Sequence, residues 1–142
     1  MWRLPPLRAE AKKVEQMQPK AGTRPVVLIV EDELLVRMDA VEVIEADGFE
    51  VIEAKNADDA IAILEQRNDI GLIFTDIDMP GSMDGLKLAH FVKDRWPPIK
   101  IIATSGHAQI TANDLPEGGR FMCKPYNPTE IADAIHELIS AA

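Results

Sequence analysis

The chain has 142 residues, of which 46% are hydrophobic, so it is long enough for one domain with a buried core. No apolar run approaches the roughly 18 residues of a membrane span, and a single cysteine excludes an internal disulfide bond. The net charge of −9 combines +4 in residues 1–24 with −13 in the remainder, which argues against binding to a nucleic-acid backbone. We therefore expect a reduced, cytoplasmic protein without direct contact to membranes or nucleic acid.

Residues 1–24 are expected to form an N-terminal extension. Pro5, Pro6, Pro19 and Gly22 interrupt this segment, and its charges leave no apolar core for a signal peptide. A short helix over Leu7–Met17 is one alternative, but the composition favours a tail without fixed structure. We place the folded domain at residues 25–142.

Five apolar runs alternate with helical patterns in the rest of the chain. The predicted strands are Val26–Val30, Phe49–Ala54, the run around Leu72–Phe74, Ile99–Ala103 and Phe121–Cys123. Helices are predicted after each of the first three strands and after the last one, where Asn127, Pro128 and Glu130 form a strong helix start.

The apolar positions predict which face of each helix is buried. In the first helix, Leu34, Met38, Val41 and Ile44 recur at helical spacing before the stop at Asp47-Gly48. The segment 108–118 has little helical pattern, so we expect a loop with at most a short helix. A repeated β-α order with right-handed crossovers predicts an α/β fold with one five-stranded parallel sheet, covered by helices on both faces.

Reactive side chains follow four of the predicted strands. The first strand ends at Glu31 and Asp32, the third at Asp76, the fourth at Thr104 or Ser105, and the fifth at Lys124. The carboxyl ends of parallel strands share one edge of the sheet, where ligands bind. An aspartate in such a place can simply cap a turn, but three carboxylates together repel unless a cation offsets them. Few protein ligands and no calcium-loop pattern favour Mg²⁺.

Magnesium beside a lysine and a hydroxyl group is typical of phosphoryl transfer. The nucleophile is expected to be a carboxylate, because no activated serine, cysteine or histidine is evident. Asp76 is the best candidate, since it ends the central strand between the acidic pair and Lys124. The product would be an aspartyl phosphate.

The set of motifs VLIVEDE, LIFTDIDMPG, IIATSGH and FMCKPY resembles the receiver domain of two-component response regulators, over about residues 25–142. The resemblance implies the doubly wound, flavodoxin-like (βα)₅ fold. It also implies that Asp76 accepts the phosphoryl group. Glu31, Asp32, Asp76 and the backbone carbonyl of Asp78 would hold Mg²⁺. Lys124 would pair with the phosphoryl group, and the Lys124-Pro125 bond would be cis.

The same resemblance implies a switch. Ser105 is preferred over Thr104 as the switch hydroxyl, because a small residue, Gly106, then follows it. Phe121 matches the rotating switch aromatic, with phenylalanine in place of the more familiar tyrosine. The distance from Ser105 to Lys124 is a few residues shorter than in most receivers, so the fourth helix is expected to be short or absent.

The resemblance further implies a role in signalling. A histidine kinase or a histidine phosphotransfer protein would donate the phosphoryl group, and a downstream protein would bind the switched surface. The domain would catalyse only its own phosphorylation and dephosphorylation. Asp78 and His107 match positions that tune the lifetime of the phosphoryl group, although both also fit ordinary exposed residues.

Two alternatives remain at this stage. The Asp76-Ile77-Asp78 sequence also resembles the nucleophile pair of haloacid-dehalogenase-type phosphatases, although the chain is short and lacks the cap segment of that class. A degenerate receiver that acts only as an interaction module is the other alternative. The complete set of Glu31, Asp32, Asp76 and Lys124 argues against it.

Overall fold

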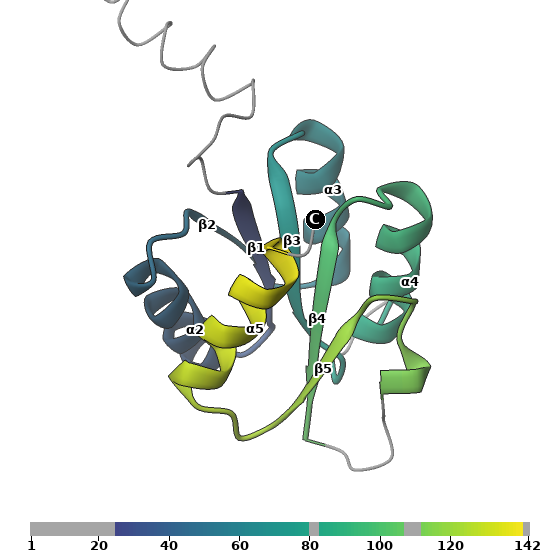
Figure 1. Cartoon of the computed structure of the whole chain (residues 1–142). Coiled ribbons are helices and arrows are strands. Elements are labelled where there is room, and N and C mark those ends of the chain that lie inside the picture. The colour runs from purple at the N-terminus through teal and green to yellow at the C-terminus, as the bar shows by residue number, and fades with distance from the viewer. Residues whose placement is uncertain (1–24, 80–82, 107–111, 141–142) are drawn as a thin grey trace, which may run out of the picture.

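The computed structural model describes residues 25–79, 83–106 and 112–140, which form one parallel sheet covered by helices (Figure 1). The five strands lie in the order β2-β1-β3-β4-β5. Their bounds are Val26–Val30 for β1, Val51–Ala54 for β2, Ile70–Asp76 for β3, Lys100–Ser105 for β4 and Arg120–Cys123 for β5. The predicted (βα)₅ sheet is confirmed, and β3 lies at its centre. The predicted extension, residues 1–24, lies outside the described residues.

The helices are α2 (Leu34–Ala46), α3 (Ala57–Gln66), α4 (Gly85–Arg95) and α5 (Pro128–Ser140). Three of these four helices, α3, α4 and α5, begin at a side-chain cap that the sequence provides, whereas α2 begins without one. Asn56 accepts a hydrogen bond from the Asp59 N–H at 2.8 Å at the start of α3. Asn127 and Glu130 cap each other's backbone N–H at 2.9 Å at the start of α5. These local signals fix the helix starts at the predicted places.

Two apolar layers hold the helices to opposite faces of the sheet. Figure 1 shows α2 and α5 on one face and α3 and α4 on the other. The α2–α5 face is built from side chains such as Ile29, Phe74 and Ile135, and the α3–α4 face from side chains such as Leu28, Ile73 and Leu88. Because successive strand residues point to opposite faces, the all-apolar strands supply both layers at once.

The predicted buried face of α2 is only partly right. Ile44 is buried together with Ala40, but the side chains of Leu34 and Met38 are 58% and 53% exposed. Leu34 and Met38 lie in the first two turns of α2, next to the carboxyl edge of the sheet, and the buried residues of the helix, Ala40 and Ile44, lie further along it. Sequence spacing identified the helix but could not show where the sheet beneath it ends.

The connection between β4 and β5 contains a single 3₁₀ turn, Ala112–Asp114, among its described residues; residues 107–111 lie outside them. The expectation of a short or absent fourth helix is confirmed. A small apolar cluster packs there against the sheet, made of Ile77, Ala103 and Leu115, with Leu86 and Phe121 at its margin. Within the described part of the chain, no helix is long and apolar enough to cross a membrane.

Candidate functional site

Three carboxylates meet at the carboxyl edge of the sheet. Glu31 follows β1, Asp32 comes next, and Asp76 is the last residue of β3. One carboxylate oxygen from each of them lies within 4.8 Å of the other two. Glu31 and Asp76 are each only 4% exposed, whereas Asp32 is exposed to solvent. The three predicted carboxylates are therefore brought together, with one side of the cluster open to water.

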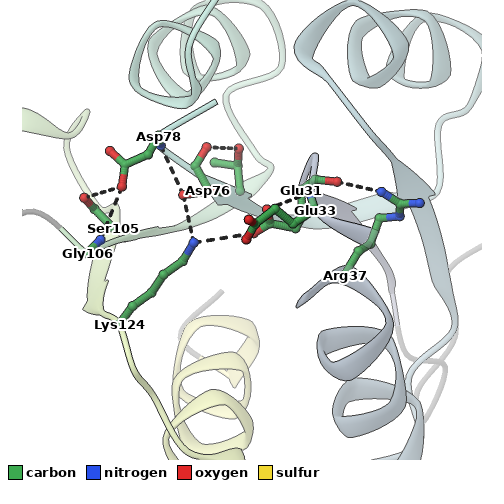
Figure 2. Close-up of polar contacts among 9 residues, drawn as sticks. Glu31, Glu33, Arg37, Asp76, Asp78, Ser105, Gly106 and Lys124 are labelled. Atoms are coloured by element: carbon green, nitrogen blue, oxygen red, sulfur yellow. Dashed lines mark hydrogen bonds and ion pairs between the residues drawn. The ribbon is translucent and has the colours of Figure 1, made fainter. Parts of the chain in front are cut away.

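Lys124 supplies the cation that the sequence predicts for this edge. Its Nζ lies 3.2 Å from Asp76 Oδ1 and 3.6 Å from Glu31 Oε1 (Figure 2). Burial of the ammonium opposes its charge, but the negative charges of Asp76 and Glu31 outweigh burial and raise the pKa of Lys124. One ammonium thus bridges the two buried carboxylates. The Lys124-Pro125 peptide bond that follows is cis, as the resemblance implies.

Glu31 is the carboxylate of this cluster whose ionisation is opposed most by its surroundings. Burial of the Glu31 carboxyl, together with the nearby charge of Asp76, raises its pKa to about 7. The Glu33 backbone N–H, which donates to Glu31 Oε2 at 3.1 Å, and the Lys124 charge only partly counter this. With all three carboxylates ionised beside one ammonium, the site carries excess negative charge, and a further cation would neutralise it and favour the ionised form of Glu31.

The donor set fits a divalent cation of the magnesium type. All the side-chain donors are carboxylate oxygens, which Mg²⁺ prefers, and the exposed side at Asp32 leaves room for the waters that Mg²⁺ keeps. The backbone carbonyl of Asp78 belongs to the same loop, since the Asp78 N–H donates to Asp76 Oδ1 at 3.1 Å.

Sequence analysis did not identify Arg37, which holds the β1 side of the site. The Arg37 guanidinium donates to the backbone carbonyl of Glu31 at 2.8 Å and pairs with Glu53 Oε1 at 3.0 Å. Its side chain is only 14% exposed. Helix α2, strand β1 and strand β2 are joined through this one group. An arginine six residues after a strand-end glutamate gives no signal by itself, because its partners come from the packing of three elements.

On the opposite side of Asp76, the Asp78 carboxylate binds the end of β4. Asp78 Oδ2 accepts a hydrogen bond from the Ser105 hydroxyl at 2.9 Å and from the Gly106 N–H at 3.3 Å (Figure 2). Ser105 is fully buried, and Thr104 uses its backbone carbonyl to accept from the Ile77 N–H at 2.8 Å. Of the two candidate hydroxyl groups, the structure places that of Ser105 in this polar network.

Two further residues shape the site. Phe121 is half-buried and packs against the Ile77–Ala103–Leu115 cluster, next to the loop that follows Asp76. Gly85 starts α4 so close to the sheet that a Cβ atom would lie 1.9 Å from the Asp76 carbonyl oxygen. Sequence analysis missed this requirement for glycine. His107 lies outside the described residues.

The sequence model of the response regulator receiver domain family matches residues 27–136. The sensor kinase CckA of Brucella abortus (strain 2308) is 33% identical over 138 residues, which cover 94% of this chain but only 14% of the kinase. The response regulator receiver protein CpdR of the same organism is 30% identical over 119 residues, 82% of this chain and 98% of CpdR.

The solved structures agree with this match. A response regulator receiver domain protein from Clostridium thermocellum superposes with a TM-score of 0.75 at 25% identity, covering 83% of this chain and 96% of that one. The sequence and structural matches lend no support to the phosphatase alternative. The chain belongs to the response regulator receiver domain family, the phospho-accepting domains of two-component signalling.

Proposed function

We propose that Asp76 is the residue that accepts the phosphoryl group. The observation that carries this proposal is the position of its carboxylate, which is 4% exposed at the end of the central strand and 3.2 Å from Lys124 Nζ. An oxygen of Asp76 attacks the phosphorus of a phosphohistidine. The new acyl phosphate bond forms as the P–N bond breaks, and the imidazole keeps the electron pair of the broken bond.

The residues around Asp76 then have distinct tasks in this reaction. Glu31, Asp32, Asp76 and the Asp78 carbonyl would hold Mg²⁺, which neutralises charge on the phosphoryl oxygens when bound. The Lys124 ammonium already lies between two carboxylates. It can therefore move to a phosphoryl oxygen while its neighbours remain anionic oxygens. Ser105 captures another phosphoryl oxygen. The domain thus catalyses only its own phosphorylation and dephosphorylation.

The donor is proposed to dock on the first two turns of α2. A histidine protein must bring its imidazole to Asp76, so the surface beside the site must contact it. Among the described residues, the exposed large apolar side chains are Leu34, Leu35 and Met38, and all three lie just after Glu31 and Asp32. A groove lined by Val36 and Tyr126, among others, continues this surface from α2 to α5 beside Lys124.

The output is proposed to be a protein contact on the β4–β5 side. Movement of Ser105 toward the phosphoryl group would open space for Phe121, which packs against the small cluster around Leu115. The surface formed by β5 and the connection before it would then favour a second arrangement that a downstream protein binds.

The acceptor is tested by labelling the protein with acetyl phosphate and measuring its intact mass. We expect one added phosphoryl group in the presence of Mg²⁺, none with EDTA and none for Asp76→Asn. Asp94→Asn, at an exposed position of α4, is the matched control and should be labelled normally. Labelling of Asp76→Asn to the normal extent, or steady turnover of p-nitrophenyl phosphate by the unaltered protein, would contradict the proposal.

The donor surface is tested separately. Leu35→Asp should slow phosphotransfer from a phosphorylated histidine protein while labelling by acetyl phosphate stays normal, because the small donor needs no docking surface. Leu35 is 74% exposed, so the change should leave folding intact. Ala62→Asp, at an exposed position of α3, is the control on the other face of the sheet. Equal slowing by both variants would contradict the proposed surface.

A further inference from the structure

The Asp78 side chain holds two groups that the phosphoryl group would need. Its Oδ2 accepts from the Ser105 hydroxyl at 2.9 Å and from the Gly106 N–H at 3.3 Å. The Asp78 backbone N–H points the other way and donates to Asp76 Oδ1 at 3.1 Å. One residue therefore links the end of β3 to the end of β4 on both sides of the candidate site (Figure 2).

A carboxylate is a strong competitor for these two donors. Hydrogen bonds to an ionised acceptor are roughly twice as strong as those between neutral groups. A phosphoryl group on Asp76 offers the same chemistry, an anionic oxygen, to the same hydroxyl group. Ser105 is fully buried, so water cannot readily replace either acceptor. The Ser105 hydroxyl group would thus exchange one strong hydrogen bond, to Asp78, for another, to the phosphoryl group.

We propose that Asp78 is a positioning residue that holds Ser105 and Gly106 in the unphosphorylated arrangement and competes with the phosphoryl group for them. The proposal goes beyond the phosphoacceptor role of Asp76 and rests on it. The carboxylate acts as a built-in ligand of the end of β4. Phosphorylation switches the domain only to the extent that the phosphoryl oxygen binds Ser105 more strongly than Asp78 does.

Removing the Asp78 acceptor should therefore favour the switched arrangement. Two variants separate this effect from simple repulsion between anions. Asp78→Asn and Asp78→Ala both remove the negative charge, but only asparagine keeps an oxygen that can accept from Ser105. Both leave the backbone carbonyl and N–H of residue 78 in place. The difference between the two variants reports on hydrogen bonding by the side chain of residue 78 without a change in charge.

The experiment uses beryllofluoride with Mg²⁺ on the full chain, with binding measured by calorimetry. Beryllofluoride stands in for the phosphoryl group on Asp76. We expect affinity to rise from the unaltered protein to Asp78→Asn and to rise again, by about three- to tenfold, to Asp78→Ala, as the loss of one neutral hydrogen bond implies. Asp133→Asn, at an exposed position of α5, is the control and should bind like the unaltered protein.

A double-mutant cycle with Ser105→Ala completes the test. Without the hydroxyl group, the difference between alanine and asparagine at position 78 should fall to about twofold or less, because the contact with the Ser105 hydroxyl group is gone. Equal affinities for Asp78→Asn and Asp78→Ala, or an undiminished difference in the Ser105→Ala background, would overturn the proposal.

A second readout needs no phosphoryl analogue. The amide proton of Gly106 should move upfield in the NMR spectrum of phosphate-free Asp78→Ala, because it loses its carboxylate acceptor. An unchanged Gly106 signal would also overturn the proposal. If the unaltered protein fails to bind beryllofluoride but the Gly106 signal moves, then the phosphoacceptor role fails while the contact between Asp78 and Gly106 stands.

Discussion

The two halves of the site are held in very different ways. On the β1 side, the backbone carbonyl of Glu31 is bound by Arg37, its carboxylate by the Glu33 N–H, and all five residues of β1 are buried. On the β4–β5 side, the carboxylate of the exposed residue Asp78 accepts from the Ser105 hydroxyl and the Gly106 N–H, and the Lys124 N–H donates to the Ser105 carbonyl. The apolar cluster behind them has three buried residues.

This difference matches the tasks of a receiver domain. A cation site works best when its ligands are fixed before the cation arrives, and the β1 side meets that requirement. A switch must leave one arrangement for another, and elements with few buried apolar contacts do so most easily. On the proposed switching side, the described residues of the connection between β4 and β5 include a single 3₁₀ turn, beside a cluster of three buried residues.

The largest effect should come from core packing on the two sides. Leu28 of β1 is fully buried in the α3–α4 layer, and Leu115 is 6% exposed in the small cluster. We expect Leu28→Ala to lower the free energy of unfolding by about 3–5 kcal/mol, and Leu115→Ala by about 2 kcal/mol, because the small cluster can collapse around the loss. Urea denaturation measures both changes. Equal losses of unfolding free energy would show that the two sides of the site are packed equally tightly.

Next in size is a pH effect on the β1 side. Burial raises the pKa of Glu31 from 4.5 to about 7, so the folded state binds this proton more tightly than the unfolded chain does. Without divalent cations, the free energy of unfolding should therefore fall as the pH rises from about 4.5 to about 7. Mg²⁺ should restore it above pH 7, since the metal needs the ionised carboxylate.

Urea denaturation across this pH range, with EDTA and with Mg²⁺, tests the effect. Glu31→Gln should remove this contribution to the pH dependence, whereas Glu65→Gln, at an exposed position of α3, should leave it intact. A Glu31→Gln protein with the same pH dependence as the unaltered one would show that Glu31 is not the group that titrates.

A smaller effect is expected from Arg37. If this guanidinium acts by fixing Glu31, then Arg37→Gln should weaken Mg²⁺ binding by about three- to tenfold, the value of one hydrogen bond to the carbonyl group. Simple electrostatics predicts the opposite sign, because removing a positive charge near the carboxylates should tighten Mg²⁺ binding. Calorimetric titration with Mg²⁺ decides between them, with Arg95→Gln, an exposed arginine paired with Glu65, as the control.

The smallest effect is expected from Arg120, on the β4–β5 side of the site. Arg120 of β5 pairs with Glu137 of α5, but the two side chains are 39% and 62% exposed. Exposed ion pairs contribute at most about 1 kcal/mol, so Arg120→Gln should change the urea midpoint little and Mg²⁺ affinity not at all. A loss of Mg²⁺ affinity equal to that of Arg37→Gln would mean that the two sides are coupled more tightly than their contacts suggest.

Local sequence features determined the elements and the positions of the site residues along the chain. The Asn56 and Asn127 caps start helices at the predicted residues, and the apolar strands end at Glu31 and Asp76. These features are short-range, because a cap or a strand end depends on neighbours within a few residues. Parallel pairing then carries the strand ends to one edge, so their meeting could also be anticipated.

Only the tertiary structure decided how these groups are held. Arg37 binds Glu31 and Glu53, and Asp78 binds Ser105, across elements that are distant in the chain. The exposure of Leu34 and Met38 depends on which part of α2 the rest of the fold covers. Several partners of suitable chemistry are available to each of these side chains in the sequence. The choice among them depends on distances of a few ångströms, which are set only when the layers pack together.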